Sequence, residues 1–512
     1  MAVIGSILHG TVRLSKTFRD KRKSDAYALQ HKTLSRLVFS ARQTAFGKAF
    51  GFSSILKQKN RIDAFRKQVP VYDYSSLYEA WWHRTVNDEP DVCCPGRPRY
   101  FALSSGTSES TSKRIPVTND MIRAVRKTST RQIISLAQYD LPATFFRKEI
   151  LMLGGSTQLK QNGLHYEGDL SGILATRIPF WFKPFYKPGK TLAKEVDWSE
   201  KLDRIAQEAI NWDIGIICGV PAWVQMLMEK IIAYHKVKHI HEVWPSLRFF
   251  VHGGVAFAPY ENEFNKLLGE PIHYLETYLA SEGFLAFQNR KERGPQQLVL
   301  DSGIFFEFVP FNEYNFDENG KLYQHAVSYT IDQVKEGIDY ALLISTCAGA
   351  WRYLIGDTVR FTNVQQHEII ITGRTKHFLS LCGEHLSVDN MNQALTAIAN
   401  THNLHIKEFT VLGVPYDSLF AHEWYIGCDN ANLSSEEFAQ LLDEQLKSLN
   451  DDYKTERTAA LKAIFVHLLP TSVFLDWMEE KGKLGGQHKF PRVLKGDLQK
   501  DWKDFVKKRN VG

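Results

Sequence analysis

Short apolar runs alternate with amphipathic stretches along most of the chain. Apolar residues at helical spacing over 202–210 precede the apolar run 214–218, a turn at 219–221 and a second helical stretch over 223–231. The same order returns after the apolar run 247–251. Period-3.6 patterns favour helices, and short apolar runs bounded by turn residues favour buried strands. The pattern predicts repeated helix–strand–helix units, and therefore an α/β fold. The first helix is expected to bury Leu202, Ile205, Ala206, Ala209 and Ile210.

The first hundred residues are expected to form a largely helical cap. Apolar side chains recur at helical spacing over 25–50, and the pattern continues from Phe65 to Trp82. In open α/β sheets, ligands collect beyond the carboxyl ends of the strands. Polar residues after each later apolar run are therefore the places to look for a site.

A second α+β pattern follows residue 373. It is expected to contain a helix over 388–399, strands over 408–412, 422–426 and 463–466, and a helix that Ser434 caps with Glu437 at capping-box spacing. We predict a large domain over residues 1–373 with mixed sheets and helices, and a smaller, mobile α+β domain over 374–512. A hinge is expected near residues 372–375.

Composition narrows the class of protein. The 512 residues are 44% hydrophobic, enough for a large core and more than one domain. A net charge of +6 is mild for this length, and Asp20 interrupts the basic run 16–23, so no nucleic-acid partner is expected. No stretch reaches 18 consecutive apolar residues, and the first residues lack the features of a signal peptide. We expect a cytoplasmic monomer without a membrane span.

The sulfur and imidazole side chains give little sign of a metal site. The six cysteines are too few for a disulfide framework and form no C-x-x-C pair, so reduced and mostly buried thiols are expected. His235, His239 and His241 could ligate a metal, but no acidic or thiol partner stands near them in the sequence. Surface histidines are the favoured interpretation.

A hydroxyl-rich loop over residues 101–116 is the most informative local feature. It follows an apolar run and could hold phosphate, because hydroxyls and backbone N–H groups around a glycine donate several hydrogen bonds to one anion, and a lysine adds positive charge. It is not a Walker P-loop. A solvated Ser/Thr-rich surface turn remains the alternative. The phosphate-binding candidates are Ser104, Ser105, Gly106, Thr107, Ser108 and Lys113.

Two further clusters follow apolar runs. Gly253 and Gly254 would let backbone approach a flat ligand such as adenine, although a tight strand–helix turn is the favoured interpretation of this cluster taken alone. In the second cluster, Tyr278 could cover a base, Ser281 adds a hydroxyl, and Glu282 could hold Mg²⁺ against phosphate oxygens. A buried tyrosine beside a surface glutamate is the alternative.

Two later positions complete the candidate set. Asp357 follows a glycine turn between apolar strands, and its carboxylate could accept both hydroxyls of a ribose; the alternative is an aspartate that closes a hairpin turn. Arg374, at the predicted hinge, is a candidate for contact with the ribose or a phosphate.

Taken in order, these motifs resemble those of the Gretchen Hagen family of acyl acid amido synthetases, members of the adenylate-forming superfamily. The resemblance covers nearly the whole chain and rests on Ser104–Ser108 with Lys113, on Tyr278–Glu282, on Arg352–Asp357 and on Gly485–Arg492. The last segment is similar to one that carries a lysine of the small domain, here Lys489. Two departures stand out: Ser110 replaces a glycine that the family often has, and Leu279 replaces an alanine of plant members.

The resemblance implies an ATP- and Mg²⁺-dependent ligase. A carboxylate attacks the α-phosphorus of ATP, pyrophosphate leaves, and an amine attacks the resulting acyl-adenylate to give an amide and AMP. An amino acid is the expected amine. Two anions must meet, so the site has to neutralise both. The resemblance implies that this charge is neutralised by Glu282 with Mg²⁺, the loop Ser104–Ser108, Lys113 and Lys489.

The two small substrates cannot be identified from the sequence. Trp223 and Met226 are candidates to line the acyl pocket, with core packing as the alternative, and the aromatic residues of 180–186 would suit a hydrophobic or aryl acid. Two other functions remain open. The acyl group could pass to a thiol such as coenzyme A or a carrier protein, or the chain could bind a nucleotide without turnover.

Overall fold

The computed structural model describes residues 25–104, 113–254, 257–317, 320–375, 388–416, 419–450, 461–483 and 489–509, with the isolated positions 379, 384, 386, 453, 454 and 457. Within these ranges, no helix combines the length and the apolar character needed to cross a bilayer. The chain separates into two compact units. Unit 1 comprises Met1–Val255, Leu267–Pro310 and Val327–Ile370, and unit 2 comprises Ala256–Lys266, Phe311–Ala326 and Ile371–Gly512. The predicted domain boundary at residues 373 and 374 stays a prediction.

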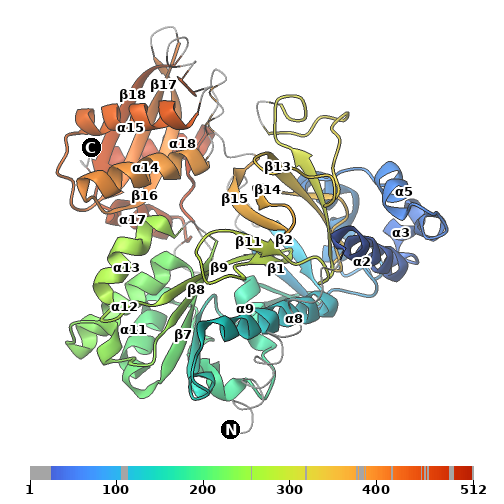
Figure 1. Ribbon diagram of the computed structural model, residues 1–512, viewed down its shortest axis with the longest axis horizontal. Coiled ribbons are helices and arrows are strands. Elements are labelled where there is room, and N and C mark those ends of the chain that lie inside the picture. The colour runs from blue at the N-terminus through green and yellow to red at the C-terminus, as the bar shows by residue number, and fades with distance from the viewer. Residues whose placement is uncertain are drawn as a thin grey trace. The chain divides into compact units, whose positions relative to one another are not determined.

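Unit 1 is built around an eleven-stranded sheet of order β12-β13-β14-β15-β11-β10-β9-β8-β7-β3-β6 (Figure 1). Its strands are β3 (Glu149–Leu153), β6 (Tyr186–Lys187), β7 (Ile214–Gly219), β8 (Phe249–Gly253), β9 (His273–Ala280), β10 (Gly283–Phe287), β11 (Gln296–Leu298), β12 (Ile304–Pro310), β13 (Asp339–Thr346), β14 (Tyr353–Asn363) and β15 (Glu368–Arg374). Strands β6, β3, β7, β8 and β9 run parallel. Their carboxyl ends therefore lie along one edge.

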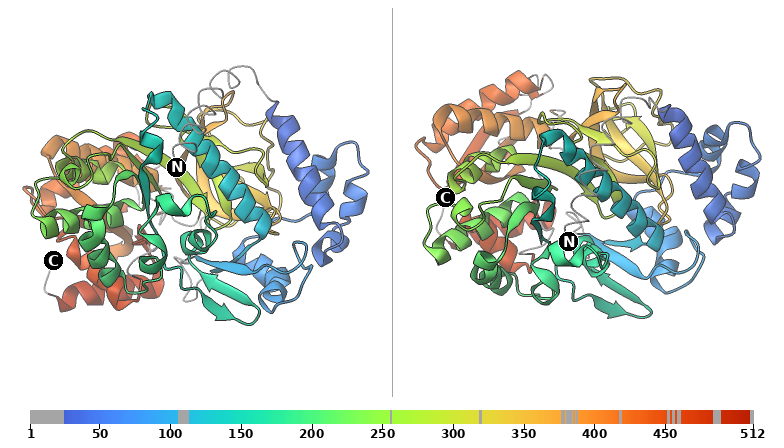
Figure 2. Two further views of the ribbon diagram at one scale, coloured as in Figure 1. Left: turned by 90° about the horizontal axis from the view of Figure 1, so that it is seen from below. Right: turned by 60° about the horizontal axis from the view of Figure 1, so that its bottom comes forward.

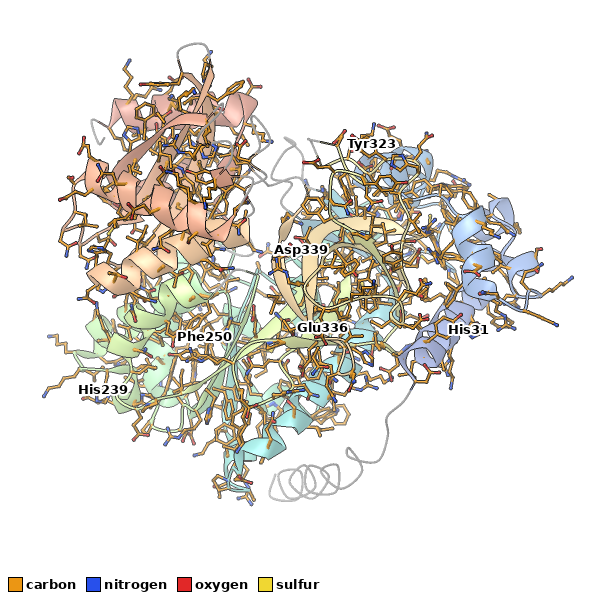
Figure 3. All side chains as sticks on the ribbon, turned by 45° about the horizontal axis from the view of Figure 1, so that its top comes forward. His31, His239, Phe250, Tyr323, Glu336 and Asp339 are labelled. Atoms are coloured by element: carbon orange, nitrogen blue, oxygen red, sulfur yellow. The ribbon has the colours of Figure 1, made fainter. Side chains whose placement is uncertain are left out.

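Helices cover this sheet. The long α8 (Asn119–Ser135) lies against β10 and is the teal helix of Figure 2. Helices α11 (Trp198–Glu208) and α12 (Pro221–His235) pack on each other, and α12 contacts β7. Shorter helices are α9 (Leu170–Thr176), α10 (Gly189–Leu192) and α13 (Glu261–Leu267), the last mostly in unit 2. The fully buried ring of Phe250, on β8, is labelled in Figure 3.

The predicted burial of one helix face is right at four of five positions. Leu202, Ile205, Ala206 and Ala209 are buried, but Ile210 is 53% exposed. The α-helix ends at Glu208 and a 3₁₀ turn, η5 (Ala209–Asn211), follows. Because a 3₁₀ turn places three rather than 3.6 residues per turn, Ile210 leaves the face that α-helical spacing predicts.

The N-terminal residues form the helices α2 (Ala26–Ala41), α3 (Ala45–Ala49), α4 (Phe52–Ile55), α5 (Arg61–Gln68), α6 (Tyr74–Leu77), η1 (Tyr78–Trp82) and α7 (His83–Val86). The expected helical cap is confirmed, but the helical pattern does not continue across residues 69–73. Val69 precedes Pro70 and is extended, as proline requires of its predecessor. Tyr72 instead forms a bridge with Tyr353 of β14.

A separate sheet of unit 1 has the order β2-β1-β5-β4. Its strands are β1 (Tyr100–Ser104), β2 (Lys113–Val117), β4 (Lys160–Asn162) and β5 (His165–Gly168). Strands β1 and β2 pair antiparallel, and their register sets Ser104 opposite Lys113. The two ends of the hydroxyl-rich segment are thus neighbours.

Unit 2 contains a four-stranded sheet of order β18-β17-β16-β19, with helices on both faces (Figure 1). Its strands are β16 (Ile406–Tyr416), β17 (Leu419–Cys428), β18 (Leu461–Leu469) and β19 (Val493–Leu494). Helices α14 (Val388–His402) and α15 (Ser435–Leu449) share one apolar cluster with the sheet, and α17 (Ser472–Glu480) and α18 (Gly496–Lys508) share another. All five predicted elements are confirmed, including the capping box of Ser434 and Glu437.

The histidines and cysteines have structural surroundings. The expectation of a surface residue is wrong for His241, which is buried with its ring nitrogens in contact with the Leu247 carbonyl and the Gly269 N–H. His235 contacts the Ala206 carbonyl at 2.8 Å. In the described part of the chain, no group of three or more His, Cys, Asp or Glu side chains could hold a metal ion, and the five cysteines found there are free thiols.

Candidate functional site

The glycine pair lies where β8 ends, at the edge formed by the strand carboxyl ends. A Cβ on Gly253 would come within 2.4 Å of the Thr277 carbonyl oxygen on β9. Gly254 has a φ of +86°. Thr277 also donates a hydrogen bond through Oγ1 to the His252 carbonyl at 3.0 Å. Gly253 is therefore required for the close approach of β8 to β9, which supports the tight-turn interpretation and leaves adenine contact a prediction.

Two predicted residues from distant strands meet directly. The Tyr278 hydroxyl on β9 donates to Asp357 Oδ2 on β14 at 2.5 Å. In the sheet order, β10, β11 and β15 lie between these strands. At roughly 4.8 Å per strand, a flat sheet would hold β9 and β14 about 19 Å apart. The sheet must curve strongly here, and this curvature brings the cluster of Tyr278 to Asp357.

Ser281 and Glu282 occupy the turn between β9 and β10. Both are buried, with exposed fractions of 7% and 8%. Gly283 follows with a φ of +151°, and a Cβ there would lie 2.9 Å from Ile304 Cδ1. The alternative of a surface glutamate at position 282 is therefore wrong. A buried carboxylate at a strand-end turn, four residues beyond the tyrosine whose hydroxyl contacts Asp357, has the chemistry of a cation ligand.

The described residues include the two ends of the hydroxyl-rich loop. Ser105, Gly106, Thr107 and Ser108, like Ser110, lie outside the described residues. Lys113, at the start of β2, has its Nζ 5.3 Å from the centroid of the Tyr74 ring. The Tyr74 hydroxyl accepts a hydrogen bond from the Arg114 N–H at 2.9 Å. Helix α6 thus supports the strand from which Lys113 projects.

The acyl-pocket candidates belong to α12, which begins just after the carboxyl end of β7. Trp223 is buried and packs edge to face on Trp198 of α11, with the ring centroids 4.9 Å apart. Met226 is half-buried. Core packing therefore accounts for Trp223, and a role in the acyl pocket stays a prediction for both residues.

Two ionisable residues that the sequence analysis did not single out lie at this edge. Lys201 is 2% exposed, its Nζ donates to the Gly154 carbonyl at 2.7 Å just beyond β3, and burial lowers its pKa to about 8. Burial also raises the pKa of Glu276, two residues before Tyr278 on β9, to about 7. One signal was available for Lys201: it stands four residues before Ile205, on the apolar face of its helix.

The pKa of Glu276 predicts a pH-dependent cost to folding. Its protonated form is favoured in the folded state, so this carboxyl destabilises the fold increasingly as pH rises from about 4.5 to about 7, and fully above that range. Replacement by glutamine removes the charge. We expect Glu276→Gln to raise the free energy of unfolding at pH 8 by on the order of 2 kcal/mol, with little change at pH 4.5. Thermal unfolding at the two pH values measures this.

Exposed Glu200 provides the matched control, because Glu200→Gln removes the same charge from the surface and should leave stability unchanged at both pH values. Equal stabilisation by Glu276→Gln at pH 4.5 and pH 8 would show that the buried charge is not the cause.

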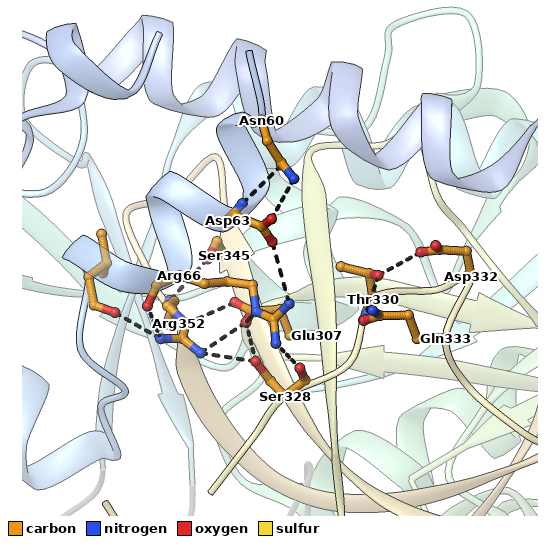
Figure 4. A network of polar contacts seen from close by, with 11 residues as sticks. Asn60, Asp63, Arg66, Glu307, Ser328, Thr330, Asp332, Gln333, Ser345 and Arg352 are labelled. Carbon is orange, nitrogen blue, oxygen red and sulfur yellow. Dashed lines mark hydrogen bonds and ion pairs between the residues drawn. The ribbon is translucent and has the colours of Figure 1, made fainter. Parts of the chain in front are cut away.

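Arg352, from the third predicted motif, belongs to a buried polar network rather than to an open site (Figure 4). Its guanidinium donates to both carboxylate oxygens of Glu307 at 3.0 Å, and to the carbonyls of Arg66 and Val69 at 2.9 Å each. Ser328 Oγ accepts a further bond at 3.1 Å. The network ties α5 to strand β12 and to the residue just before β14, so Arg352 holds the scaffold from which β14 starts.

The two remaining predicted residues belong to unit 2. Arg374 is the exposed last residue of β15. Lys489 is exposed, and the next residue, Phe490, is buried against the rings of Phe474 and Trp502 at centroid distances of 4.9 and 5.0 Å. Phe490 thus anchors the backbone at Lys489 while the lysine side chain remains outside the core.

A cavity of about 340 Å³ lies elsewhere in unit 1, between α2, α8 and the turn at 346–351. None of the predicted site residues lines it. Gly253 and Gly254 instead lie where β8 ends, Ser281 and Glu282 on the turn after β9, and Asp357 on the strand that Tyr278 reaches.

Unit 1 is therefore an α/β domain with polar and ionisable side chains at the carboxyl ends of parallel strands. This is the position at which α/β proteins bind small ligands. The fold defines an α/β protein with a large and a smaller domain, and these turns are its candidate small-molecule site.

The chain belongs to the GH3 family. Its residues 16–194, 297–374 and 389–497 match the GH3 family N-terminal, central and C-terminal domains. It is 29% identical over 128 residues to a probable indole-3-acetic acid-amido synthetase GH3.6 of Oryza sativa subsp. japonica, covering 24% of this chain and 25% of that protein. It is 23% identical over 335 residues to the indole-3-acetic acid-amido synthetase GH3.4 of Arabidopsis thaliana, covering 60% of this chain and 54% of that protein.

These matches span a quarter and about half the length of the two relatives. Among solved structures, the AtGH3.15 acyl acid amido synthetase in complex with 2,4-DB superimposes with a TM-score of 0.78 at 16% identity, over 97% of this chain and 96% of that one. The two chains share their fold, as the resemblance of the motifs predicted.

Proposed function

We propose that this protein is an ATP-dependent ligase that activates a carboxylic acid as its acyl-adenylate and transfers the acyl group to an amine, with release of pyrophosphate and AMP. The observation that carries the proposal is the contact between Tyr278 and Asp357 beside the turns of Gly253 and Glu282, in a chain of the GH3 family. An amino acid is the proposed amine, since a relative from Nicotiana attenuata is named as a jasmonoyl–L-amino acid synthetase.

The residues fit a nucleotide with a divalent cation. A ribose offers two hydroxyl donors, and the Asp357 carboxylate, oriented by the Tyr278 hydroxyl, supplies acceptors for them. Glu282 offers the oxygen ligands that Mg²⁺ prefers, and a bound Mg²⁺ would supply the positive charge that lets a carboxylate approach a phosphate. We assign Tyr278 to cover the base, and Ser281 with the backbone at Gly253 and Gly254 to border it.

Phosphate binding is assigned to the segment between β1 and β2. Ser104, Ser105, Gly106, Thr107 and Ser108 would donate to phosphate oxygens, and Lys113 would offset their charge. The pairing of Ser104 with Lys113 supports this assignment, because it fixes both ends of the segment next to each other.

A cation on the C-terminal part of the chain completes the charge balance in this proposal. We assign Lys489 to stabilise the negative charge that develops on the leaving pyrophosphate. Arg374 is assigned to contact the ribose or a phosphate. Movement of a small domain over residues 374–512 about a hinge at 372–375 would bring these side chains into and out of use. No protein nucleophile is needed, because the adenylate is the activated species.

The proposed function is tested with purified protein by acid-dependent exchange of labelled pyrophosphate into ATP. A panel of aliphatic and aryl acids identifies the acyl substrate, and amino acids are then added to detect AMP and the amide. Exchange without amide formation, followed by thioester formation with coenzyme A, would favour the thiol acceptor. ATP binding without exchange across the panel would favour a nucleotide-binding protein without turnover.

Removal of the Tyr278 hydroxyl should weaken nucleotide binding. Tyr278→Phe keeps the ring and loses a hydrogen bond to a carboxylate, which costs about 1.5 kcal/mol or more. We expect KM for ATP to rise by about tenfold, with a smaller change in kcat. Steady-state kinetics of pyrophosphate release measure both constants.

Tyr340→Phe is the control, since Tyr340 is a buried core tyrosine whose hydroxyl accepts a hydrogen bond from the Lys335 N–H at 3.0 Å. It should leave KM unchanged. An unaltered KM for ATP in Tyr278→Phe would show that the Tyr278 hydroxyl does not contribute to nucleotide binding.

A further inference from the structure

An aromatic turn protrudes from unit 1 at residues 179–182. The Phe182 N–H donates to the Pro179 carbonyl at 3.0 Å, which closes a turn with Phe180 and Trp181 at its two central positions. Phe180 is 82% exposed, the highest value among the exposed large hydrophobic side chains of the described residues, and Trp181 is 44% exposed. A 3₁₀ turn, η4 (Lys183–Phe185), follows, and buried Phe185 fixes its base.

Positive charge surrounds this turn in the sequence. Residues 177–194 contain Arg177, Lys183, Lys187, Lys190 and Lys194, and no aspartate or glutamate. Of these, Lys187 pairs with Glu149 at 3.2 Å. Lys183, Lys190 and Lys194 are exposed and make no ion pair within the described ranges. The segment therefore presents uncompensated positive charge beside two exposed aromatic rings.

The turn lies away from the candidate site. It leads directly into β6, which runs parallel to β3 with Tyr186 opposite Ile150. A segment that enters a parallel strand is at the amino edge of the sheet, whereas Gly253 and the turn of Glu282 lie at the carboxyl edge. The aromatic residues of this segment, considered above as suited to an aryl acid, are therefore not placed to line the proposed acyl site.

We propose that residues 177–194 form a membrane-docking loop that binds the surface of an anionic lipid bilayer. Phe180 and Trp181 enter the interfacial layer, where amphipathic aromatic rings are favoured, and the lysines contact lipid headgroups. A protein interface of ordinary stability needs about 800 Å² from each partner. Two rings at the corner of a tight turn form a small convex surface. Such a surface is better suited to insertion into a lipid bilayer than to a complementary protein interface.

The experiment measures sedimentation of the full chain with sucrose-loaded vesicles. Vesicles of phosphatidylcholine with 30% phosphatidylserine are compared with vesicles of phosphatidylcholine alone, at 0.1 M and 0.5 M salt. We expect partitioning to fall by at least about tenfold without the anionic lipid, and to weaken strongly at high salt. The variant Phe180→Ser/Trp181→Ser should lose about tenfold or more on anionic vesicles, because its apolar rings no longer leave water.

Charge reversal in Lys183→Glu/Lys190→Glu should reduce binding by a similar factor. Two double variants are matched controls. Leu164→Ser/Tyr314→Ser removes side chains that are 65% and 70% exposed elsewhere, and Lys57→Glu/Lys59→Glu reverses two exposed charges on another surface. Both should bind as the parent does. All substituted residues are exposed, and unchanged thermal unfolding confirms that each variant folds.

Three results would overturn the proposal. The parent chain could bind anionic and neutral vesicles equally, or the Phe180/Trp181 variant could bind as the parent does. Alternatively, vesicle binding could be absent while the parent is a dimer by sedimentation velocity and that variant a monomer, which would assign the turn to contact between two copies. The outcome does not depend on catalytic activity.

Discussion

Lys489→Ala should lower acid-dependent pyrophosphate exchange by about a thousandfold, the loss typical when one preorganised charge or donor at a transition state is removed. The proposed step brings a carboxylate anion to a polyphosphate, so the barrier is dominated by charge that the protein must offset. Lys489 is exposed and the adjacent Phe490 holds its backbone, so alanine removes an ammonium without disturbing a core. Exchange of labelled pyrophosphate at saturating ATP measures the effect.

The matched control is Lys500→Ala on α18, because Lys500 is another exposed lysine of the same unit. It should keep full exchange activity. ATP binding, measured by calorimetry, should survive in both variants, since neither changes Tyr278, Glu282 or Asp357, the residues of unit 1 assigned to the nucleotide and its cation. Full exchange activity in Lys489→Ala would show that Lys489 takes no part in adenylation. The roles assigned to Tyr278 and Asp357 would not be affected.

Arg352→Met should destabilise the protein by about 3–5 kcal/mol, the cost of leaving one partner of a buried ion pair without the other. Glu307 is 1% exposed, and Arg352 supplies both of its charge-assisted bonds on the side shown in Figure 4. Two backbone carbonyls lose their donor as well. Urea unfolding, followed by tryptophan fluorescence, measures the loss, and activity should fall with the folded fraction rather than through KM.

A partly exposed ion pair provides the comparison. Arg360 donates to both oxygens of Asp339 at 3.0 and 2.8 Å, with side chains about one-third exposed, and Asp339 is labelled in Figure 3. Arg360→Met should cost no more than about 1 kcal/mol. The double variant Arg352→Met/Glu307→Leu should recover much of the lost stability, because the two most buried charges leave together. Arg66, which lies 3.6 Å from Glu307, keeps its ion pair with Asp63 at 3.9 Å. Equal costs for Arg352→Met and Arg360→Met would contradict this account.

Local features could be predicted from the sequence where a short stretch of chain decides them. The strands over 214–218 and 408–412 and the Ser434 capping box follow from periodicity and from the residue types at each end. The error over residues 69–73 shows the limit. Apolar spacing favoured a continuous helix, but Pro70 restricts its neighbour, and Tyr72 gains a bridge to β14 that no local pattern encodes.

The family could likewise be recognised from the order of the motifs, because motif order is a property of the chain alone. The roles of individual residues could not. Arg352 stands in a predicted motif, yet its partners Glu307, Arg66 and Val69 make it part of the scaffold. Lys201 and Glu276 carry no motif, and their pKa values depart from the ordinary range because tertiary packing removes them from water.

The amino-acid sequence by itself determined the α/β class, most element positions and the family, since these depend on residue type and spacing within a few turns of chain. Only the tertiary structure decided that Tyr278 touches Asp357. Four steps of strand pairing separate them, and the contact exists because the sheet curves and closes the distance that a flat sheet would leave. Curvature arises from the twist and packing of many strands together, so no single segment specifies it.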